Sequence, residues 1–289
     1  MPLELVLNVA VGGVLTGLVY GLMALGLSVI FGVMRVVNFA HGEMMTIAMY
    51  AAVIAFAQWQ LDPFLMLLPV AGGLFLFGYA LQAGLINPFI ARPEHSQFIL
   101  LVAVAIIMVN GLLMAFGPNA RNVLVPYALD SFEFGPLLVD KVRLYAAVAS
   151  LGLAAALFVF FRGTRTGKAI RAAADNHTGA LVVGLNVQRL YALTFGLGSA
   201  CVGAAGCLMA LLIDVTPTLG PVYTLLGFVI VIVGGLGSMA GALLGGVLIG
   251  LSEALAGLFL VPSAKSMVSF ALLILVLLIR PHGLLGRST

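Results

Sequence analysis

Long apolar runs, separated by short polar or glycine-rich breaks, make up most of this chain. A helix needs about 20 apolar residues to cross the hydrocarbon core of a bilayer, and runs near that length recur from one end of the sequence to the other. We predict membrane-spanning helices at residues 5–31, 44–59, 64–86, 97–116, 142–161, 190–213, 221–236, 240–260 and 265–280. The pattern predicts an all-α polytopic membrane protein whose residues 1–289 form one transmembrane domain.

Two of the breaks leave the number of spans open. The stretch from Gly32 to Glu43 interrupts an apolar run, and the short run 221–236 ends in GGLGSMAG at residues 234–241. Glycines and polar side chains at membrane depth are typical of broken or re-entrant helices. We therefore expect eight to ten transmembrane helices, some of them broken or re-entrant.

Composition supports a membrane protein and excludes a large soluble domain. Hydrophobic residues make up 63% of the chain and charged residues 8%, and the mean hydropathy is +1.21, whereas soluble domains carry about 25% charged residues. The net charge of +3 is spread among loops, so we expect the lipid bilayer and no nucleic acid as a partner. Cys201 and Cys207 stand six residues apart on one predicted helix, which places them too far apart for a disulfide, so we interpret both as packing residues.

Lysine and arginine separate onto two sets of loops. One set holds Arg35, Arg92, Arg162, Arg165, Lys168, Arg171, Arg189, Arg280 and Arg287, and the other holds Arg121, Lys141, Arg143 and Lys265. Cytoplasmic loops of membrane proteins carry the excess of basic residues. We therefore expect the first set in the cytoplasm, the N-terminus outside and the C-terminus inside.

Residues 162–189 form the longest predominantly polar stretch, which we call the polar segment. We expect Thr166 to cap a short helix at 167–175, and Thr178 to cap a second turn that ends at Gly184. Small and basic side chains share the first helix, an arrangement that suits docking of a partner protein. The alternative is a solvated loop whose charges only satisfy the positive-inside rule.

The motif NFAHGE contains the candidate gate residues Asn38, His41, Gly42 and Glu43. Polar groups at membrane depth usually face a cavity or pair with one another, so a hinge or gate beside a transport route is one interpretation. The other is a short cytoplasmic loop in which Asn38 caps the next helix. The glycine-rich break in the second half adds the candidates Gly235, Gly237 and Ser238 as a possible counterpart.

Glu253 is a further intramembrane polar residue, about two thirds of the way along a predicted span. We expect its partner to be Lys265 or a polar group across the bundle, unless the carboxylate is simply hydrated near the interface. A proton or ion relay needs several aligned acids, and this span offers one. The presence of only one acid in this span therefore argues against a proton-driven carrier.

Glycines recur every fourth residue at Gly13, Gly17 and Gly21, and again in the pairs Gly241–Gly245 and Gly246–Gly250. Such faces allow helices to approach closely. Ordinary helix packing is one interpretation, and the lining of a narrow passage is the other.

Sequence motifs for catalysis are missing from the chain. Gly167–Lys168 has Arg162 where a phosphate-binding loop begins with glycine, and neither a His-Glu-x-x-His metal motif nor a Gly-x-Ser-x-Gly elbow occurs. We therefore expect no catalytic residue, metal ion or cofactor in this chain, and no ATP binding.

Four motifs, in this order, resemble a known family: GLVYGLMALGLSVIFGVMRVVNFAHGEMMTIAMY, RAAADNHTGALVVGLNVQRLYALTF, VIVGGLGSMAGALLGGVLIGLSEAL and IRPHGLLG. Together they are similar to permeases of high-affinity branched-chain amino acid ABC importers, and NFAHGE and the length look like the shorter permease. The resemblance implies that the polar segment couples to an ATPase, through the candidate residues Lys168, Arg171, Ala172, Ala173, Asp175 and Gly184.

The resemblance also implies partners. These are a second, longer permease, two ATP-binding subunits that bind and hydrolyse ATP, and a periplasmic solute-binding protein, at the bacterial inner membrane. It implies alternating access as the mechanism. Two alternatives stay open: the same ABC architecture for urea, amides or a sugar, and an ATPase-independent secondary carrier.

Overall fold

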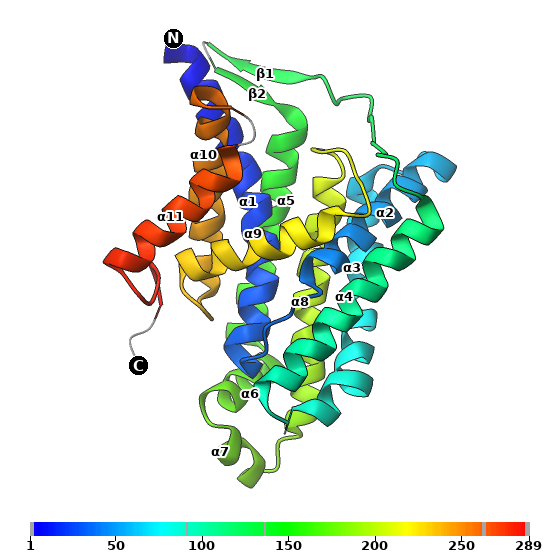
Figure 1. Ribbon diagram of the computed structural model, residues 1–289, viewed down its shortest axis with the longest axis vertical. Coiled ribbons are helices and arrows are strands. Elements are labelled where there is room, and N and C mark those ends of the chain that lie inside the picture. The colour runs from blue at the N-terminus through cyan, green and yellow to red at the C-terminus, as the bar shows by residue number, and fades with distance from the viewer. Residues whose placement is uncertain (1–2, 91, 136, 262–263, 287–289) are drawn as a thin grey trace.

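A computed structural model describes residues 3–90, 92–135, 137–261 and 264–286, and shows a helical bundle with a small β-hairpin at one end (Figure 1). Each predicted span coincides with one helix: α1 (Leu3–Met34), α2 (His41–Trp59), α3 (Pro63–Leu81), α4 (Glu94–Phe116), α5 (Lys141–Gly163), α8 (Val187–Met209), α9 (Leu219–Gly234), α10 (Met239–Phe259) and α11 (Lys265–Ile279). A π-helix, Gln82–Ile86, and a 3-10 turn, Asn87–Phe89, continue α3. Among the described residues, six helices are long and apolar enough to cross a membrane, and α9 and α11 are shorter apolar helices. The all-α polytopic fold is confirmed.

The two ends of the bundle differ in structure. At the end that we call the hairpin side, strands β1 (Ser131–Phe134) and β2 (Leu137–Asp140) pair antiparallel, and the backbone amide of Leu138 donates to Asn8 of α1 at 2.9 Å. At the opposite end, the loop side, lie the short helices α6 (Arg165–Asp175) and α7 (His177–Val182) (Figure 1). The N-terminal helix therefore begins on the hairpin side and runs toward the loop side.

Helices α1, α3 and α5 run toward the loop side and α4, α8 and α10 run toward the hairpin side, whereas α9 lies across the bundle, so the predicted alternation holds for only part of the chain (Figure 1). Arg35, Arg92 and the polar segment follow helices that run toward the loop side, whereas Arg121 and Lys141 lie near the hairpin. Arg287, which was assigned to the basic set, lies outside the described residues. The polar segment, which holds the largest group of basic residues in the first set, lies on the loop side.

A glycine seam joins α1 to α10 along much of their length. A Cβ atom built on Gly17 would lie 2.7 Å from the carbonyl oxygen of Gly246, and one on Gly250 would lie 2.4 Å from the Cα of Gly17. No side chain fits such a contact, so the glycines allow backbone to meet backbone. The helix-packing interpretation of this repeat is confirmed.

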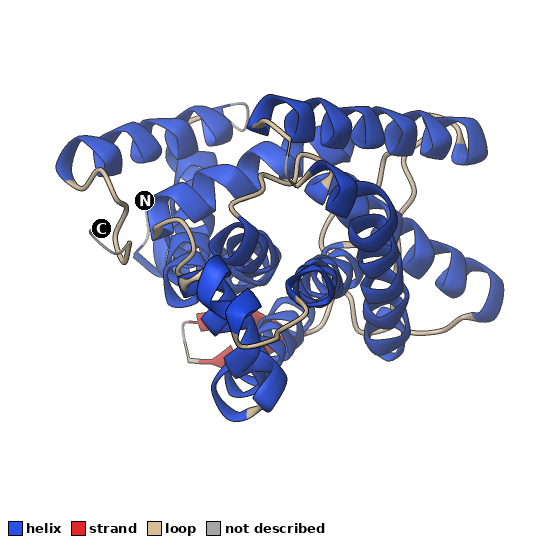
Figure 2. Cartoon of the chain, turned by 90° about the horizontal axis from the view of Figure 1, so that it is seen from below, coloured by secondary structure: helices blue, strands red, loops and turns tan. Residues whose placement is uncertain are grey.

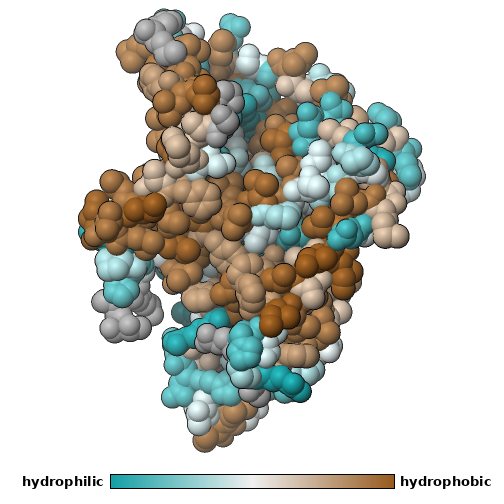
Figure 3. Space-filling view, viewed as in Figure 1, coloured by the Kyte–Doolittle hydropathy of each residue, from teal (hydrophilic) through white to brown (hydrophobic). Residues whose placement is uncertain are grey.

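Hydrophobic residues cover the middle of the molecule between more polar ends (Figure 3). Leu68, Ile107 and Val148, on three different helices, are all more than half exposed. Exposed apolar surface of this extent suits contact with lipid tails rather than with water. Seen along the long axis, some helices are end-on while others lie across the view (Figure 2), so the bundle is not a simple parallel stack.

Candidate functional site

The break between α1 and α2 lies inside the bundle. Helix α1 ends at Met34, Arg35 turns the chain with a left-handed φ of 54°, and α2 begins at His41, whose Nε2 lies 3.0 Å from the carbonyl oxygen of Met23. Met23 precedes Met34 by 11 residues, which is about 16 Å of helix. Residues 35–40 therefore return into the bundle before α2 starts.

Most polar atoms at this break find partners within the protein, whereas His41 Nδ1 is buried without a hydrogen-bond partner among the described residues. Asn38, His41 and Glu43 are at most 2% exposed, and Asn38 Oδ1 accepts a hydrogen bond from the amide of Ala40 at 3.1 Å. The N-cap of α2 is Ala40, which makes no side-chain capping bond. The expectation that Asn38 caps the helix is therefore wrong, because its side chain closes the preceding turn instead.

Thr224 of α9 joins the break to the second half of the chain. Its hydroxyl oxygen accepts from the amide of Gly42 at 2.9 Å and donates to Glu43 Oε2 at 3.0 Å. A Cβ on Gly42 would lie 2.0 Å from the carbonyl oxygen of Gly220, so only glycine allows this approach. Sequence reasoning missed Thr224, although a threonine within the apolar run 219–233 is a signal for such a role.

The second break, between α9 and α10, is a turn of glycines. Gly235 and Gly237 have φ values of 107° and 77°, which other residues rarely adopt. Ser238 caps α10 by accepting from the amide of Gly241 at 3.1 Å. Leu284 and Leu285, near the C-terminus, donate their amides to the last carbonyls of α9 at 2.9 Å. These bonds satisfy groups that a helix end leaves unpaired.

The two breaks touch at one point, where a Cβ on Gly32 would lie 3.1 Å from the Cα of Gly237, but their polar side chains contact different parts of α9. The first contacts α9 in its first half, at Thr224, and the second follows the end of α9 at Gly234. Helix α9 therefore connects them, and a movement of this helix would reach both.

The polar segment forms two short helices, as predicted, but their caps differ. Thr164 caps α6 by accepting from the amide of Gly167 at 2.9 Å, and Asn176 caps α7 by accepting from Gly179 at 2.8 Å. The predicted caps Thr166 and Thr178 are wrong because each helix begins earlier than expected. Gly184 has a left-handed φ of 81°, as its predicted place at the end of this region requires.

Helix α6 packs one face against the ends of α1, α5 and α8 and exposes the other. Four of the candidate coupling residues in α6, Lys168, Arg171, Ala172 and Asp175, are exposed, and so is Gly184 beyond α7. Ala173 differs, because it is only 2% exposed. It packs within the chain and offers no surface to a partner, which corrects its assignment as a docking residue.

An exposed apolar patch lies beside these charges at the end of α7. Leu181, Val182 and Val183 are 52%, 83% and 74% exposed. Figure 3 shows a hydrophobic tip on the otherwise polar loop end of the molecule. Consecutive exposed apolar residues in a polar region usually mark a contact with another protein.

Glu253 finds its partner across the bundle. Its Oε1 accepts from the hydroxyl of Ser269 in α11 at 2.9 Å. The described residues show no ion pair within 4.0 Å between Glu253 and Lys265. Of the two expected partners, the polar group on a neighbouring helix is therefore the closer one.

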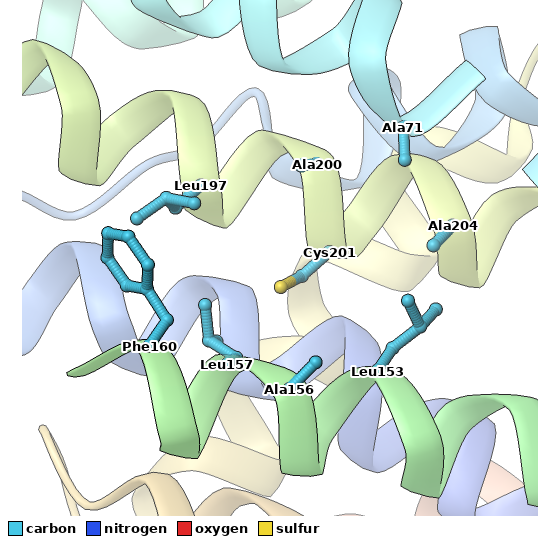
Figure 4. A pocket seen from close by; sticks show the side chains of 9 residues that line it. All are labelled: Ala71, Leu153, Ala156, Leu157, Phe160, Leu197, Ala200, Cys201 and Ala204. Carbon is cyan, nitrogen blue, oxygen red and sulfur yellow. The ribbon is translucent and has the colours of Figure 1, made fainter. Parts of the chain in front are cut away.

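A separate groove of about 230 Å³ lies between α3, α5 and α8. Its lining is almost wholly apolar, and the thiol of Cys201 is its one polar side-chain group (Figure 4). Cys201 and Cys207 are both free and buried, in agreement with their interpretation as packing residues. Such a groove suits an apolar chain and not a polar solute.

Metal ligands do not cluster in the part of the chain that the structure describes, where no group of three or more His, Cys, Asp or Glu residues could hold an ion.

Comparison with known proteins matches this architecture to a family. The family model described as "Branched-chain amino acid transport system / permease component" matches residues 9–277. The high-affinity branched-chain amino acid transport system permease protein BraD of Pseudomonas aeruginosa is 31% identical over 292 residues, which cover 96% of this chain and 94% of that protein. LivH of Escherichia coli K12, which carries the same description, is 31% identical over 291 residues, or 95% and 94% of the two chains. A probable branched-chain amino acid transport permease protein LivH of Methanocaldococcus jannaschii is 26% identical over 282 residues, or 92% and 88%. No solved structure matches this chain.

Proposed function

Since the chain belongs to the family of branched-chain amino acid transport permease components, we propose that it is the shorter permease of an ATP-binding-cassette importer that moves branched-chain amino acids by alternating access. The observation that carries this proposal is the exposed surface of the polar segment. Basic side chains of α6 and apolar side chains at the end of α7 are both exposed there, without a covering element in the described chain.

This surface is where separate ATPases would drive the permease. Lys168 and Arg171 orient a partner by charge, and Val182 offers apolar area that a groove on the partner would bury. Ala172 and Gly184 are small and exposed, so a partner can approach their backbone closely. Asp175 adds a negative charge to the basic residues of α6, and such a mixed charge pattern can discriminate between partners.

Packing provides a route from this surface to the centre of the bundle. Helix α6 contacts α1, α5 and α8, and α1 contacts α9 and α10. A pull on α6 would therefore shift α1 and reach α9, which holds the break at Asn38, His41, Gly42 and Glu43 through Thr224. Gly235, Gly237 and Ser238 allow α9 to turn against α10. We assign these two breaks to the gate of the transport route.

The proposed assembly contains a second, longer permease, two ATP-binding subunits and a periplasmic solute-binding protein. It lies in the bacterial inner membrane, with the loop side in the cytoplasm and the hairpin side outside. ATP is bound by the partner subunits, and this chain supplies part of the path. The N-terminus is then outside and the C-terminus cytoplasmic.

Uptake by the reconstituted complex tests this function. Proteoliposomes that contain the purified complex and its solute-binding protein are expected to accumulate radiolabelled leucine only when ATP reaches the ATPases. Excess isoleucine and valine should compete, whereas urea, acetamide and ribose should not. Leucine uptake by this chain alone, driven by an ion gradient without ATP, would contradict the proposal in favour of a secondary carrier.

Bulk added at the docking surface tests the coupling role. The substitution Ala172→Trp is expected to release the ATPases during purification and to abolish ATP-driven uptake. Its matched control is Ala103→Trp, on the exposed face of α4, which adds the same bulk far from the polar segment. If both variants retain the ATPases and full uptake, coupling does not run through α6.

A further inference from the structure

A cavity of about 430 Å³ lies in the hairpin half of the bundle, apart from both breaks and the polar segment. Its walls come from α1, α5, α10 and α11 and from the chain that follows α8. Along α1 the lining runs from Val9 to Tyr20, which is about 16 Å of helix. Sites for small molecules typically enclose roughly 300–1,000 Å³, so this cavity has room for a small solute.

Charges of both signs line this cavity. Arg143 of α5 and Lys265 of α11 are basic, and Glu253 of α10 is acidic. The Ser269 hydroxyl donates to Glu253 at 2.9 Å, and Glu253 also interacts with Tyr20. Among the described residues, neither cation comes within 4.0 Å of the Glu253 carboxylate. The acid and the bases therefore face one space without closing it by direct ion pairs.

Glycines make room for both cationic side chains. A Cβ on Gly12 would lie 2.7 Å from a terminal nitrogen of Arg143, and a Cβ on Gly257 would lie 2.7 Å from Cε of Lys265. Within the described part of the chain Arg143 makes one ion pair, with Asp140, whose Oδ2 lies 3.8 Å from the Arg143 Nε. A guanidinium carries five N–H donors, so this single long contact leaves most of them for a ligand.

One residue of the lining connects the cavity to α9. Tyr20, its deepest lining residue on α1, packs edge-on against Tyr223 with ring centroids 6.3 Å apart. The residue after Tyr223 is Thr224, which holds Gly42 and Glu43 at the start of α2. A solute in the cavity would therefore contact Tyr20, whose ring packs against Tyr223 of α9.

We propose that this cavity is a receiving site for a zwitterionic α-amino acid with an apolar side chain, on the hairpin side of the gate. Glu253 binds the ammonium group, Arg143 and Lys265 bind the carboxylate, and Val9, Ile213 and Leu258 contact the apolar side chain. The assignment rests on the proposed function, because it takes the solute to be one that the permease moves.

The chemistry of the lining favours this class of ligand over others. A neutral solute such as urea or a sugar gains little from separated charges of opposite sign, and a simple cation or anion would meet a group that repels it. A zwitterion pairs with both kinds of charge at once, and charge-assisted hydrogen bonds are the strong ones. Apolar lining residues beside the charges select an apolar side chain.

Binding to the purified permease–ATPase complex in lipid nanodiscs, without the solute-binding protein, tests the site. The probes are L-leucine, leucinamide, which lacks the carboxylate, and 4-methylpentanoate, which lacks the ammonium group. Wild-type protein is expected to prefer leucine over both. Glu253→Gln should weaken leucine binding about 10- to 100-fold and bring it level with 4-methylpentanoate. Arg143→Gln with Lys265→Gln should bring leucine level with leucinamide instead.

Glu133→Gln and Arg121→Gln are the matched controls, since both residues lie on the hairpin side but outside the cavity. Both controls should bind leucine as the wild type does. A binding preference that Glu253→Gln leaves unchanged overturns the assignment, and so does a wild-type complex that binds no leucine. ATP-driven leucine uptake reports separately on the proposed function. Normal uptake by all cavity variants would support the proposed function and contradict the assignment of the cavity as an amino acid site.

Discussion

The central break, which is the break between α1 and α2, and the polar segment use their polar residues in opposite ways. At the break, buried polar groups bond to the chain itself, as Thr224 does to Gly42 and Glu43. On the polar segment, charges are solvated and apolar residues such as Val182 are exposed. A region whose polar groups bond mostly within the chain can hold a defined conformation alone, whereas an exposed apolar patch is suited to contact with a partner. The comparison separates a gate built within the chain from a coupling surface completed by another protein.

The largest effect should follow a substitution that breaks the packing of the central break. In Gly42→Val the new Cβ would meet the Gly220 carbonyl at 2.0 Å, and overpacking of this kind costs about 3 kcal/mol. We expect a loss of monodisperse protein and of thermal stability in detergent. Gly163→Val, at an exposed glycine of the polar segment with open space around it and no left-handed φ, should leave the protein folded. An equal loss of stability in both variants would contradict the proposed difference between a tightly packed break and an open polar segment.

The next effect concerns the exposed patch on the polar segment. Val182→Asp places a charge where we expect an apolar contact, and should weaken ATPase association by about 2 kcal/mol or roughly 30-fold. Stability of the isolated permease should not change, because the side chain is 83% exposed. Titration of the ATPase against immobilised permease measures the affinity. Unchanged affinity would mean that this patch contacts something else.

A smaller effect is expected for the hydroxyl that joins α9 to the break. Thr224→Val keeps the shape but leaves the amide of Gly42 and the Glu43 carboxylate without this partner, at a cost of about 1–3 kcal/mol. Thr224→Ser keeps the hydroxyl and should restore most of the lost stability. Thermal unfolding of the two variants side by side provides the measurement. If serine and valine behave alike, the hydroxyl is not what holds the break.

The smallest effect tests the corrected cap of α6. Thr164→Ala removes the side-chain acceptor of the Gly167 amide and should cost about 1 kcal/mol, seen as faster hydrogen exchange confined to the first turn of α6. Thr166→Ala, the cap that the sequence suggested, should leave exchange there unchanged. Faster exchange in Thr166→Ala but not in Thr164→Ala would mean that Thr166 caps α6 and that the correction is wrong.

The helices were predictable because each follows an apolar run that a bilayer requires to be helical. Predicted span 142–161 and observed helix Lys141–Gly163 differ by one or two residues at each end. The caps were missed because Thr164 and Thr166 are chemically equivalent in sequence, and only packing against Phe160 and Phe161 decides between them.

The partners of the candidate site residues depend on contacts between distant parts of the chain. Thr224 meets Gly42 across 182 positions, and no local pattern encodes that distance. Ala173 and Ala172 are likewise alike in sequence, yet the register of α6 buries the first and exposes the second. Sequence therefore identifies the polar residues that matter, while the tertiary fold decides which of them pair and which remain available.

Site-specific crosslinking in native membranes tests the contrast between the two regions most directly. One variant, Val182→Cys, places a reactive thiol on the polar segment, and Leu129→Cys places one at a hairpin-side residue that is 97% exposed. The native Cys201 and Cys207 are buried and should react little. We predict that Val182→Cys crosslinks to an ATP-binding subunit, and that Leu129→Cys does not. Crosslinking of that subunit to Leu129→Cys, or to neither variant in an otherwise intact complex, would contradict the account.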